Sequence, residues 1–462
     1  MPSPRPVPPP SWLPTLLSSW HPTPLPTSLA LLLCLMGTLT ACDGPAKAGH
    51  AGVAAANTAD STVSPRGTAG TAGTAAAAGA GANAAAAAGE AAAAGTAAAA
   101  ATAGAPGATG AAGPAAAIAV KLGRDRHLLV GLGTYSTVET MRQQGIRPDI
   151  IDTYLTGVGK SSWIDYVQPA GAYITKTAQE ARDIGAIPLY TLYGMAQNGD
   201  GNVTGILSRT FMRAYWAQAR LMFQLLGQLD APVLVNLEPD FWGYVYNYAP
   251  AHDPAQLGAV VSSEPECRTL PDLAPSVAPC LLAMARQYAP KALVGMPPAL
   301  WGRPPGSVAA YMRAMGAAQA DFVVAQTSDR DAGCAEVAAP PPECAGRTGP
   351  FYWNDLGGGA LSFRQSQQDY AEYARLLGGN PTLLWWQTPL GVPSTTPGGT
   401  LQHFRDNHVD YMLQHTAEYA AIHTLGMVFS GGAAAQTSIS TDGGQFARLW
   451  KAYQAGGGTP LQ

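Results

Sequence analysis

Two carboxylates flank a proline in the stretch Glu238-Pro239-Asp240, directly after an apolar run at 232–237. Acid–base cleavage of a glycosidic bond needs two carboxyl groups at one site, one protonated and one ionised. The residue before a proline is restricted to extended backbone. We therefore expect Glu238 to keep strand geometry and to point beyond the strand's end. We predict that Glu238 or Asp240 is the catalytic acid.

Acids and aromatic rings also follow the other apolar runs. The second catalytic carboxylate is expected to be Asp152 or Asp329, with Asp355 and Asp200 behind them. Aromatic faces stack on sugar rings, and carboxylates and amides bind sugar hydroxyls. On that ground the expected substrate-binding residues are Tyr154, Tyr193, Trp242, Tyr244, Trp301, Gln326, Trp353, Asp355, Trp386 and Gln387.

Each of these acids has a non-catalytic alternative. Glu238 could pair with an arginine of the following helix, and Asp240 could cap a helix or lie in a loop. Asp152 could be a polar residue of a barrel interior. Asp329, in the run SDRD, could belong to a solvated turn.

Short apolar runs alternate with longer amphipathic ones from residue 118 onward. The eight candidate strands start at residues 127, 149, 186, 232, 292, 321, 382 and 425. Buried strands alternating with helices predict a parallel sheet covered on both faces. Eight such units in 118–462 predict an α/β fold, the (β/α)8 TIM barrel, whose active sites lie at the carboxyl ends of the strands. An open doubly wound sheet is the alternative. The clearest helix is expected after Ser208, which can cap it.

The combination resembles the barrel glycoside hydrolases. In their largest clan an Asn-Glu pair closes strand four and supplies the acid/base, and a glutamate on strand seven is the nucleophile. Asn236 and Glu238 match the first loosely, and Gln387 stands in place of the second. The tripeptide at 238–240 also resembles the Glu-Pro-Asp motif of inverting cellulases, and Trp301 is similar to a tryptophan of their subsites. The resemblance implies hydrolysis of a polysaccharide or oligosaccharide.

The N-terminal region has the features of an export and anchoring segment. An apolar run at 28–41 is too short to span a membrane and fits the hydrophobic part of a secretory signal. The residues at 39–42 resemble a bacterial lipobox, which implies a signal peptide at 1–41 and a lipid on Cys42. A plain signal peptide is the alternative. Asp43 resembles an inner-membrane retention signal. We expect an exported protein held at the periplasmic face of the inner membrane, or at the outer membrane or cell surface.

The segment between the lipid site and the domain is almost wholly Ala, Gly and Thr. Such a composition cannot bury enough apolar surface to offset the entropy of ordering it. Residues 42–117 are therefore predicted to be a flexible tether.

Four further cysteines lie in the domain: Cys267, Cys280, Cys334 and Cys344. An even number of cysteines in an exported protein predicts two disulfides. Sequence alone leaves the pairing open, and we favour the local pairs 267–280 and 334–344.

The composition argues against several classes of protein. A net charge of −4 with 12% charged residues gives no basic stripe for nucleic acid. The spacing of the histidines at 403, 408, 415 and 423 does not converge on one metal, and no cofactor is expected.

Two other functions stay open. Gln387 favours a carbohydrate-binding barrel without catalysis, and the long tether favours an envelope structural or interaction lipoprotein. The oligomeric state is not predicted.

Overall fold

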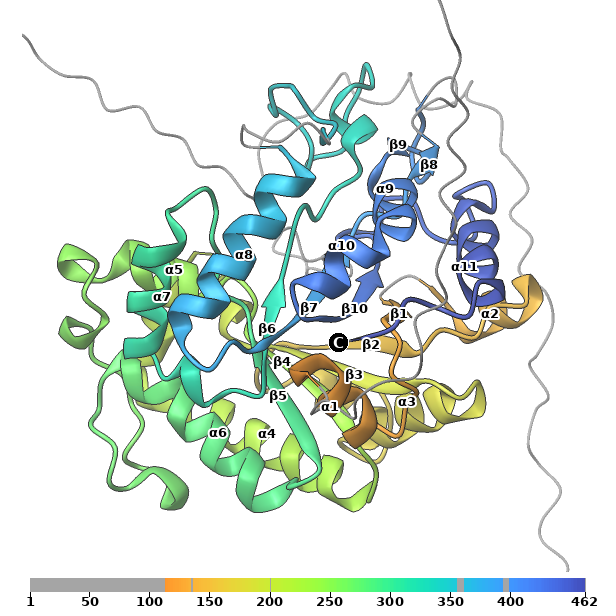
Figure 1. Ribbon diagram of the computed structural model, residues 1–462. Coiled ribbons are helices and arrows are strands. Elements are labelled where there is room, and N and C mark those ends of the chain that lie inside the picture. The colour runs from red at the N-terminus through yellow and green to blue at the C-terminus, as the bar shows by residue number, and fades with distance from the viewer. Residues whose placement is uncertain (1–112, 134–135, 200, 355–360, 394–398, 462) are drawn as a thin grey trace, which may run out of the picture. The chain divides into compact units, whose positions relative to one another are not determined.

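A computed structural model describes residues 113–133, 136–199, 201–354, 361–393 and 399–461 of the chain. In this part, eight parallel strands close into a barrel in the order β1-β10-β7-β6-β5-β4-β3-β2 (Figure 1). The strands are β1 (Leu129–Leu132), β2 (Ile150–Thr156), β3 (Ile187–Tyr193), β4 (Val233–Leu237), β5 (Ala292–Met296), β6 (Phe322–Ala325), β7 (Thr382–Thr388) and β10 (Thr424–Phe429). All eight predicted strands are confirmed, and the open sheet is excluded.

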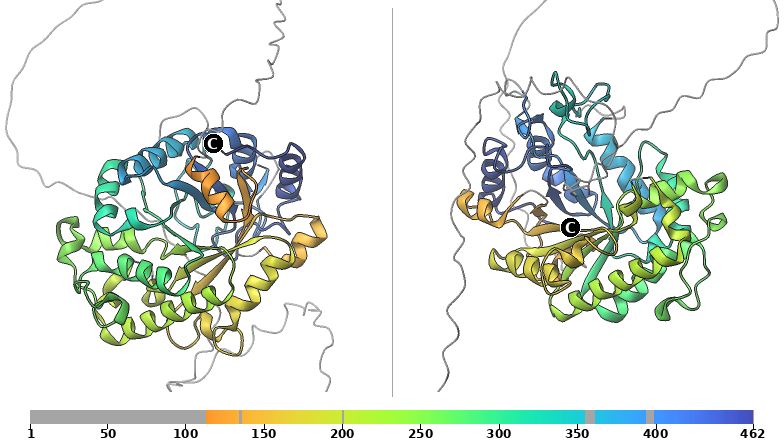
Figure 2. Two further views of the ribbon diagram at one scale, coloured as in Figure 1. Left: turned by 60° about the horizontal axis from the view of Figure 1, so that its bottom comes forward. Right: turned by 180° about the vertical axis from the view of Figure 1, so that it is seen from behind.

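Helices surround the barrel on its outer side (Figure 2). They are α2 (Val138–Gln144), α3 (Ala172–Asp183), α4 (Arg209–Gln228), α5 (Phe241–Tyr248), α6 (Val277–Tyr288), α7 (Pro305–Ala314), α8 (Phe363–Leu377), α9 (His408–Gln414), α10 (Thr416–Ala421) and α11 (Gln445–Ala455). The cap of α4 is confirmed, because Ser208 Oγ accepts a hydrogen bond from the Phe211 amide. The chain between α9 and α10 leaves helical geometry at His415, whose ring nitrogen bonds to the Tyr411 carbonyl.

A further helix, α1 (Pro114–Lys121), lies at the amino-terminal ends of the strands. Just after it, Arg124 donates hydrogen bonds to the carbonyls of Asp149 and Gly185, the residues that lead into β2 and β3. Ala115 and Ala116 of α1 are buried in the core. Residues 114–117 therefore belong to the folded domain, although the sequence analysis placed them in the tether.

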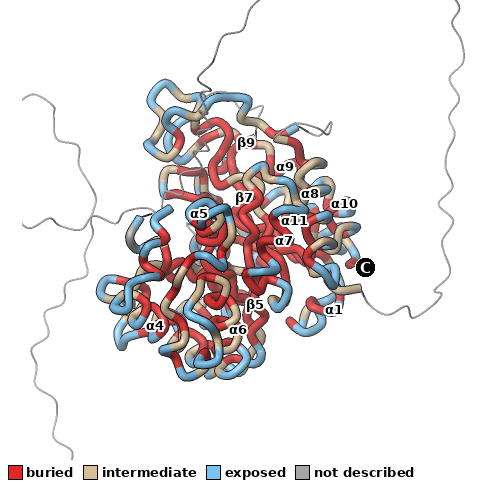
Figure 3. The backbone as a smooth tube through the Cα atoms, turned by 90° about the vertical axis from the view of Figure 1, so that its left-hand side faces the viewer, coloured by how far each residue is buried: buried red, intermediate tan, exposed pale blue. Residues whose placement is uncertain are grey.

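The core runs through the strands and the inner faces of the helices (Figure 3). Every residue of β3, β4, β5, β6, β7 and β10 is buried, as parallel strands covered on both faces require. The strand β2 differs, because Ile151 and Thr153 are only partly covered. No helix among the described residues is long and apolar enough to cross a membrane.

Two disulfides fasten the long connections. Cys267 pairs with Cys280 at the start of α6, and Cys334 pairs with Cys344 in the loop after β6. Both local pairings are confirmed. Beyond β7, two short strands, β8 (Val392–Pro393) and β9 (Arg405–Asp406), pair in parallel and draw the loop after β7 together.

Candidate active site

Among the predicted acids, Asp152 lies within a strand, with its carboxylate inside the barrel. Asp152 on β2 accepts a hydrogen bond from the Thr191 hydroxyl of β3 (2.7 Å) and another from the Trp386 indole of β7 (2.9 Å). Since β2 and β7 are not neighbours in the barrel, the contact between Asp152 and Trp386 crosses its interior. Asp152 is therefore the predicted acid that the structure places inside the barrel.

The surroundings of Asp152 favour its protonated form. Burial raises the pKa of Asp152 to about 6, while the hydrogen bonds from Thr191 and Trp386 lower it. Desolvation penalises the charged carboxylate, and donors that stabilise the charge offset only part of that penalty. A carboxyl group of this kind can hold a proton in mildly acidic solution and release it to a substrate.

Aromatic rings stand next to this acid. Tyr154 lies two residues along β2 and so on the same face of the strand. Its ring centroid is 5.7 Å from that of Trp386 and 6.2 Å from that of Tyr193 at the end of β3. Three of the expected substrate-binding rings thus form one cluster beside Asp152.

Three of the predicted acids act on this cluster. Burial is the main cause that raises the pKa of Tyr154 well above its usual value, and the charges of Asp152, Asp240 and Asp329 raise it further. The Arg330 guanidinium acts in the opposite direction. The charges of one acid on β2 and of two acids in the loops after β4 and β6 therefore act on the same ring.

Asp240 occupies the turn between β4 and α5 in a left-handed backbone conformation, with φ 66°. Its charge also raises the pKa of Tyr370, whose hydroxyl bonds to the backbone of Gln326 at the end of β6. The charge of Asp240 therefore raises the pKa of Tyr154 on one side of the barrel and that of Tyr370 on the other. Non-glycine residues with positive φ are strained and gather at functional sites.

Glu238 does not have the predicted geometry. Its φ of 47° is left-handed rather than extended, and its side chain is fully buried. One carboxylate oxygen accepts from the Gly194 amide (3.1 Å) and the other from the Met195 amide (2.9 Å), and the Tyr215 hydroxyl of α4 lies beside them. Burial raises the pKa of Glu238 to about 7. The predicted extended backbone at Glu238 is wrong, and its carboxylate is taken up by the amides of the loop after β3.

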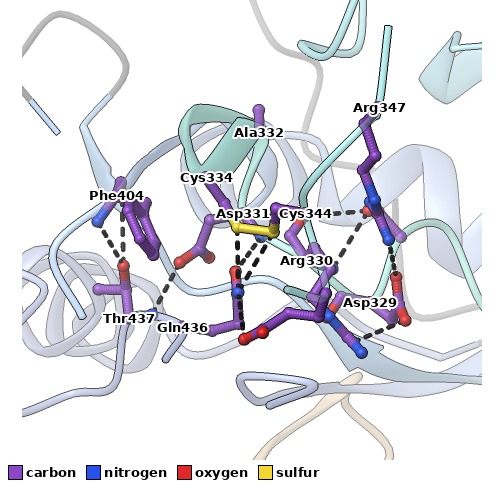
Figure 4. Close-up of a disulfide and its surroundings, with 12 residues drawn as sticks. Asp329, Arg330, Asp331, Ala332, Cys334, Cys344, Arg347, Phe404, Gln436 and Thr437 are labelled. Atoms are coloured by element: carbon purple, nitrogen blue, oxygen red, sulfur yellow. Dashed lines mark hydrogen bonds and ion pairs between the residues drawn. A yellow bond between two sulfur atoms is a disulfide. The ribbon is translucent and has the colours of Figure 1, made fainter. Parts of the chain in front are cut away.

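Asp329 belongs to a buried ion pair rather than to a solvated turn (Figure 4). Its carboxylate accepts from the fully buried Arg330 guanidinium at 2.6 Å and from Arg347 at 3.4 Å. Arg330 also donates to the Asp329 carbonyl. The charge of Asp329 reaches the mouth, but its oxygens are committed to two arginines.

Two amide side chains meet at the ends of β6 and β7. Gln326 Nε2 donates to Gln387 Oε1 at 2.8 Å. Gln387 has φ 53°, another left-handed residue at a strand end. The two amides thus lie at one place, opposite the side of the barrel that carries β2 and β3.

Two of the predicted substrate-binding tryptophans are packed into the protein instead. Trp242 is fully buried, and its indole donates to the Leu237 carbonyl. Trp353 packs against Phe363 of α8 and His408 of α9. Both positions are corrections, because neither ring joins the cluster at the mouth.

The remaining predicted rings lie on the rim formed by the loops after β3, β4 and β5. Tyr193 and Tyr244 line the same small pocket, and the Tyr244 ring lies 5.1 Å from that of Trp301. Asp355, Asp200 and Cys42 lie outside the described residues.

A groove of about 620 Å³ lies along β2. Asp152, Tyr154 and Gly133 line it, and the groove continues between α2 and α3. Charged side chains of these helices border it: Glu139, Arg142, Lys176, Glu180 and Asp183. Asp152 is thus nearly buried yet borders an open space.

Sequence reasoning missed the residues that hold the acids. Thr191 could have been predicted, because it lies two residues before Tyr193 on β3 and therefore on the same face of the strand. The sequence has no pattern that predicts the ion pair of Arg330 or the amide donors of Gly194 and Met195. These contacts depend on how separate loops meet.

No protein-family model matches the chain, and no curated protein matches it. Among solved structures it is similar to a GH5 xyloglucan-specific β-1,4-glucanase from a ruminal metagenomic library, with a TM-score of 0.43 and 12% identity over 75% of this chain and 97% of that one. It is also similar to a GH5 lichenase from Caldicellulosiruptor sp. F32 (TM-score 0.38, 10% identity, 70% and 92%) and to a triple mutant of an endo-β-1,4-glucanase from Xanthomonas axonopodis pv. citri (0.41, 14%, 71% and 99%). The likeness is one of fold.

Proposed function

We propose that the protein is a glycoside hydrolase that cleaves a polysaccharide or oligosaccharide at the carboxyl ends of its barrel strands. The observation that carries the proposal is Asp152. It is a carboxyl group inside the barrel with a pKa raised to about 6, it borders a groove, and it lies beside the rings of Tyr154 and Trp386. A proton donor next to aromatic faces is what cleavage of a glycosidic bond requires.

In this mechanism the protonated Asp152 gives its proton to the glycosidic oxygen as the bond to the anomeric carbon breaks. Positive charge develops on the sugar ring, and the carboxylate of Asp240 stabilises that charge from the β4 side of the mouth. Asp240 then either bonds to the anomeric carbon or removes a proton from the attacking water. The rings of Tyr154 and Tyr193, which meet edge to face, hold the sugar in place.

Glu238 takes a supporting part in this proposal. Its two oxygens hold the amides of Gly194 and Met195, the residues that directly follow Tyr193. Glu238 is therefore a positioning residue for the loop that presents this ring, and Asp152 replaces it as the proposed acid.

The test is hydrolysis of a library of plant, bacterial and algal glycans by the domain from residue 113 onward. We expect release of reducing sugar from at least one glycan, and proton NMR of the first product tells whether the anomeric configuration is kept or inverted. Absence of hydrolysis across the library, with the fold intact by circular dichroism, would overturn the proposal.

A second function is favoured by the amide pair at the ends of β6 and β7. Gln387 carries no charge, and its amide is occupied by Gln326, so β7 contributes no carboxylate at its end. A barrel that binds glycans through its rings without cleaving them fits this feature. Binding of a glycan that is never hydrolysed would select this function.

We also propose that the protein is exported and anchored through a lipid on Cys42. The sequence at 28–42 supports this proposal, and two disulfides suit an oxidising compartment. Labelling of cells with a fatty-acid analogue tests it: label in the membrane fraction should disappear in Cys42→Ser. A labelled Cys42→Ser variant, or an unlabelled wild type, would contradict it.

A further inference from the structure

The loop after β5 is built around strained residues. Ala299 and Trp301, two residues apart, have φ values of 48° and 45°. The Trp301 ring packs so closely on α5 that a Cβ atom at Gly243 would come within 2.5 Å of it. Strain of this kind persists only when the surrounding structure enforces it, and it concentrates at binding sites.

This loop carries an arginine whose charge is not compensated by an acid. The guanidinium carbon of Arg303 lies 4.5 Å from the centre of the Tyr246 ring and 5.2 Å from that of Trp301. One of its nitrogens donates to the Ala299 carbonyl at 3.0 Å. Among the described residues no carboxylate lies within ion-pair distance of Arg303. The acid-paired arginines differ in this respect: Arg220, Arg286, Arg330, Arg347 and Arg405.

The electrostatic surroundings of Arg303 agree with the lack of an acid partner among the described residues. Burial lowers the pKa of Arg303, and the only groups that raise it are Tyr246 and Tyr311. Arginine stays charged in proteins, so a half-buried cation without an acid has lost part of its hydration and gained no ionic partner. Its planar fork keeps free N–H donors for a carboxylate.

Aromatic rings connect this arginine with the proposed catalytic acid. The series begins with Tyr154 and Tyr193 beside Asp152, and Tyr193 shares a small pocket with Tyr244. The Tyr244 ring contacts Trp301, which in turn contacts Arg303. Successive sugars of one chain can stack along such a series of rings.

We propose that Trp301 and Arg303 form a subsite for an acidic sugar, so that the substrate is a glycan containing uronic acid. The Trp301 ring holds the Arg303 guanidinium in place, and the Arg303 fork binds the carboxylate of the sugar. This inference rests on the proposed function for its location and names the substrate class of that site.

The experiment measures binding in the Asp152→Asn background, so that affinity is read without turnover. The probes are oligosaccharides of galacturonate, mannuronate and glucuronate, each compared with the neutral hexose oligosaccharide of equal length. At least one acidic probe should bind more tightly than its neutral counterpart. Arg303→Gln should weaken that binding by about 10- to 100-fold, the range of a hydrogen-bonded charge. Neutral probes should change less than about twofold, which also shows that the variant is folded.

Two further variants separate charge from geometry. Arg303→Lys keeps the charge without the fork and should restore only part of the affinity. Arg313→Gln on α7, an exposed arginine that donates to the Leu376 carbonyl, should have no effect on either kind of probe.

The outcomes distinguish the two proposals. Hydrolysis of neutral glycans with no acidic preference, or a preference unchanged in Arg303→Gln, would overturn the subsite and leave the hydrolase standing. Acidic binding that depends on Arg303, without hydrolysis by the wild type, would keep the subsite and overturn the hydrolase. Absence of binding to every probe would overturn the subsite, and the hydrolysis screen alone would then decide the hydrolase.

Discussion

Carboxylates are buried in two regions near the carboxyl ends of the barrel strands, and the two regions differ in the hydrogen-bond donors of these carboxylates. At the mouth, Asp152 accepts from two side chains, Thr191 and Trp386. In the cluster formed by the loops after β6, β7 and β10, Asp331 accepts from the backbone amides of Gly391 and Thr437. Asp406 in that cluster accepts from the amides of Ala332 and His408 and from the His408 ring.

Asp331 and Asp406 hold loops together, whereas Asp152 is the acid that can meet a substrate. Each backbone amide bonded by Asp331 or Asp406 lies in a loop or at the start of a helix, where it would otherwise be a buried donor without a partner. Burial, and then the charge of Asp406, raise the pKa of Asp331, so a raised pKa occurs in both regions. What distinguishes Asp152 is that it borders the groove. Glu238, bonded to two loop amides, belongs with the loop-tying acids.

The largest effect expected from this comparison is on activity at the mouth. Asp152→Asn keeps the shape of the side chain and removes the proton donor, so kcat on the hydrolysed glycan should fall by about 10³-fold. The melting temperature should stay within a few degrees of the wild type, because the amide oxygen still accepts from one neighbour. The exposed acid Asp410 offers a control, and Asp410→Asn should be fully active. Full activity of Asp152→Asn would remove Asp152 from the mechanism.

The second prediction concerns the loop cluster. In Asp406→Asn an amide NH₂ must face the Ala332 or the His408 amide, leaving a buried donor opposite another donor. The free energy of unfolding in urea should fall by about 3 kcal/mol. The rate per folded molecule should change little, because the cluster ties loops together and does not act on substrate. A stable variant with lost activity would reverse these roles.

The fold was predictable from the sequence because each strand is a short apolar run, and burial on both faces produces that pattern whatever the neighbours are. Asp152 and Tyr154 were predictable for a related reason. Alternation along a strand places residues two apart on one face, and the carboxyl ends of all strands meet at one mouth.

The errors come from contacts between distant segments. The preference of a residue before proline for extended backbone is a local bias, and at Glu238 two amide hydrogen bonds from the loop after β3 outweigh it. Trp242 is close to two acids in sequence, but α5 turns its indole toward the Leu237 carbonyl. No local pattern reports which side of a short helix faces the core when both sides are aromatic.

The third prediction tests the placement of Glu238 with the loop-tying acids. Glu238→Gln puts an amide NH₂ against the Gly194 or Met195 amide and should lower the free energy of unfolding by about 2 kcal/mol. The hydrolysis rate of the folded fraction should fall less than about tenfold, since the loop still carries Tyr193. Unchanged stability with a loss as large as that of Asp152→Asn would instead make Glu238 the catalytic acid.

The fourth prediction is a dependence of stability on pH that both regions share. The pKa values of Asp152 and Glu238 are raised to about 6 and about 7 in the fold, from 3.8 and 4.5. Between those limits the folded state binds more protons than the unfolded chain, so the free energy of unfolding falls as pH rises from about 4 to 7. The slope should be at most about 1.4 kcal/mol per pH unit for each group. Glu266, whose pKa Arg220 lowers to about 2, acts in the opposite direction and only below pH 4.5.

Urea titrations at several pH values measure that slope. The double variant Asp152→Asn, Glu238→Gln should reduce the slope without abolishing it, because these two positions no longer titrate while Asp331, whose pKa is also raised, still does. Stability that rises over the same interval would mean that both carboxylates are ionised in the fold.

The smallest expected effect comes from the loss of one hydrogen bond to Asp152. The neighbouring tryptophan on β7 provides the control. Trp386 donates to Asp152 across the barrel interior, whereas Trp385 donates to Thr424 at 3.1 Å. Trp386→Phe removes a donor that favours the ionised acid, so the pKa of Asp152 should rise further. The falling alkaline limb of the pH dependence of kcat should then move to higher pH by about half a unit to one unit. Trp385→Phe should leave that limb in place. If both variants shift it equally, the tryptophans affect packing and do not set the charge of Asp152.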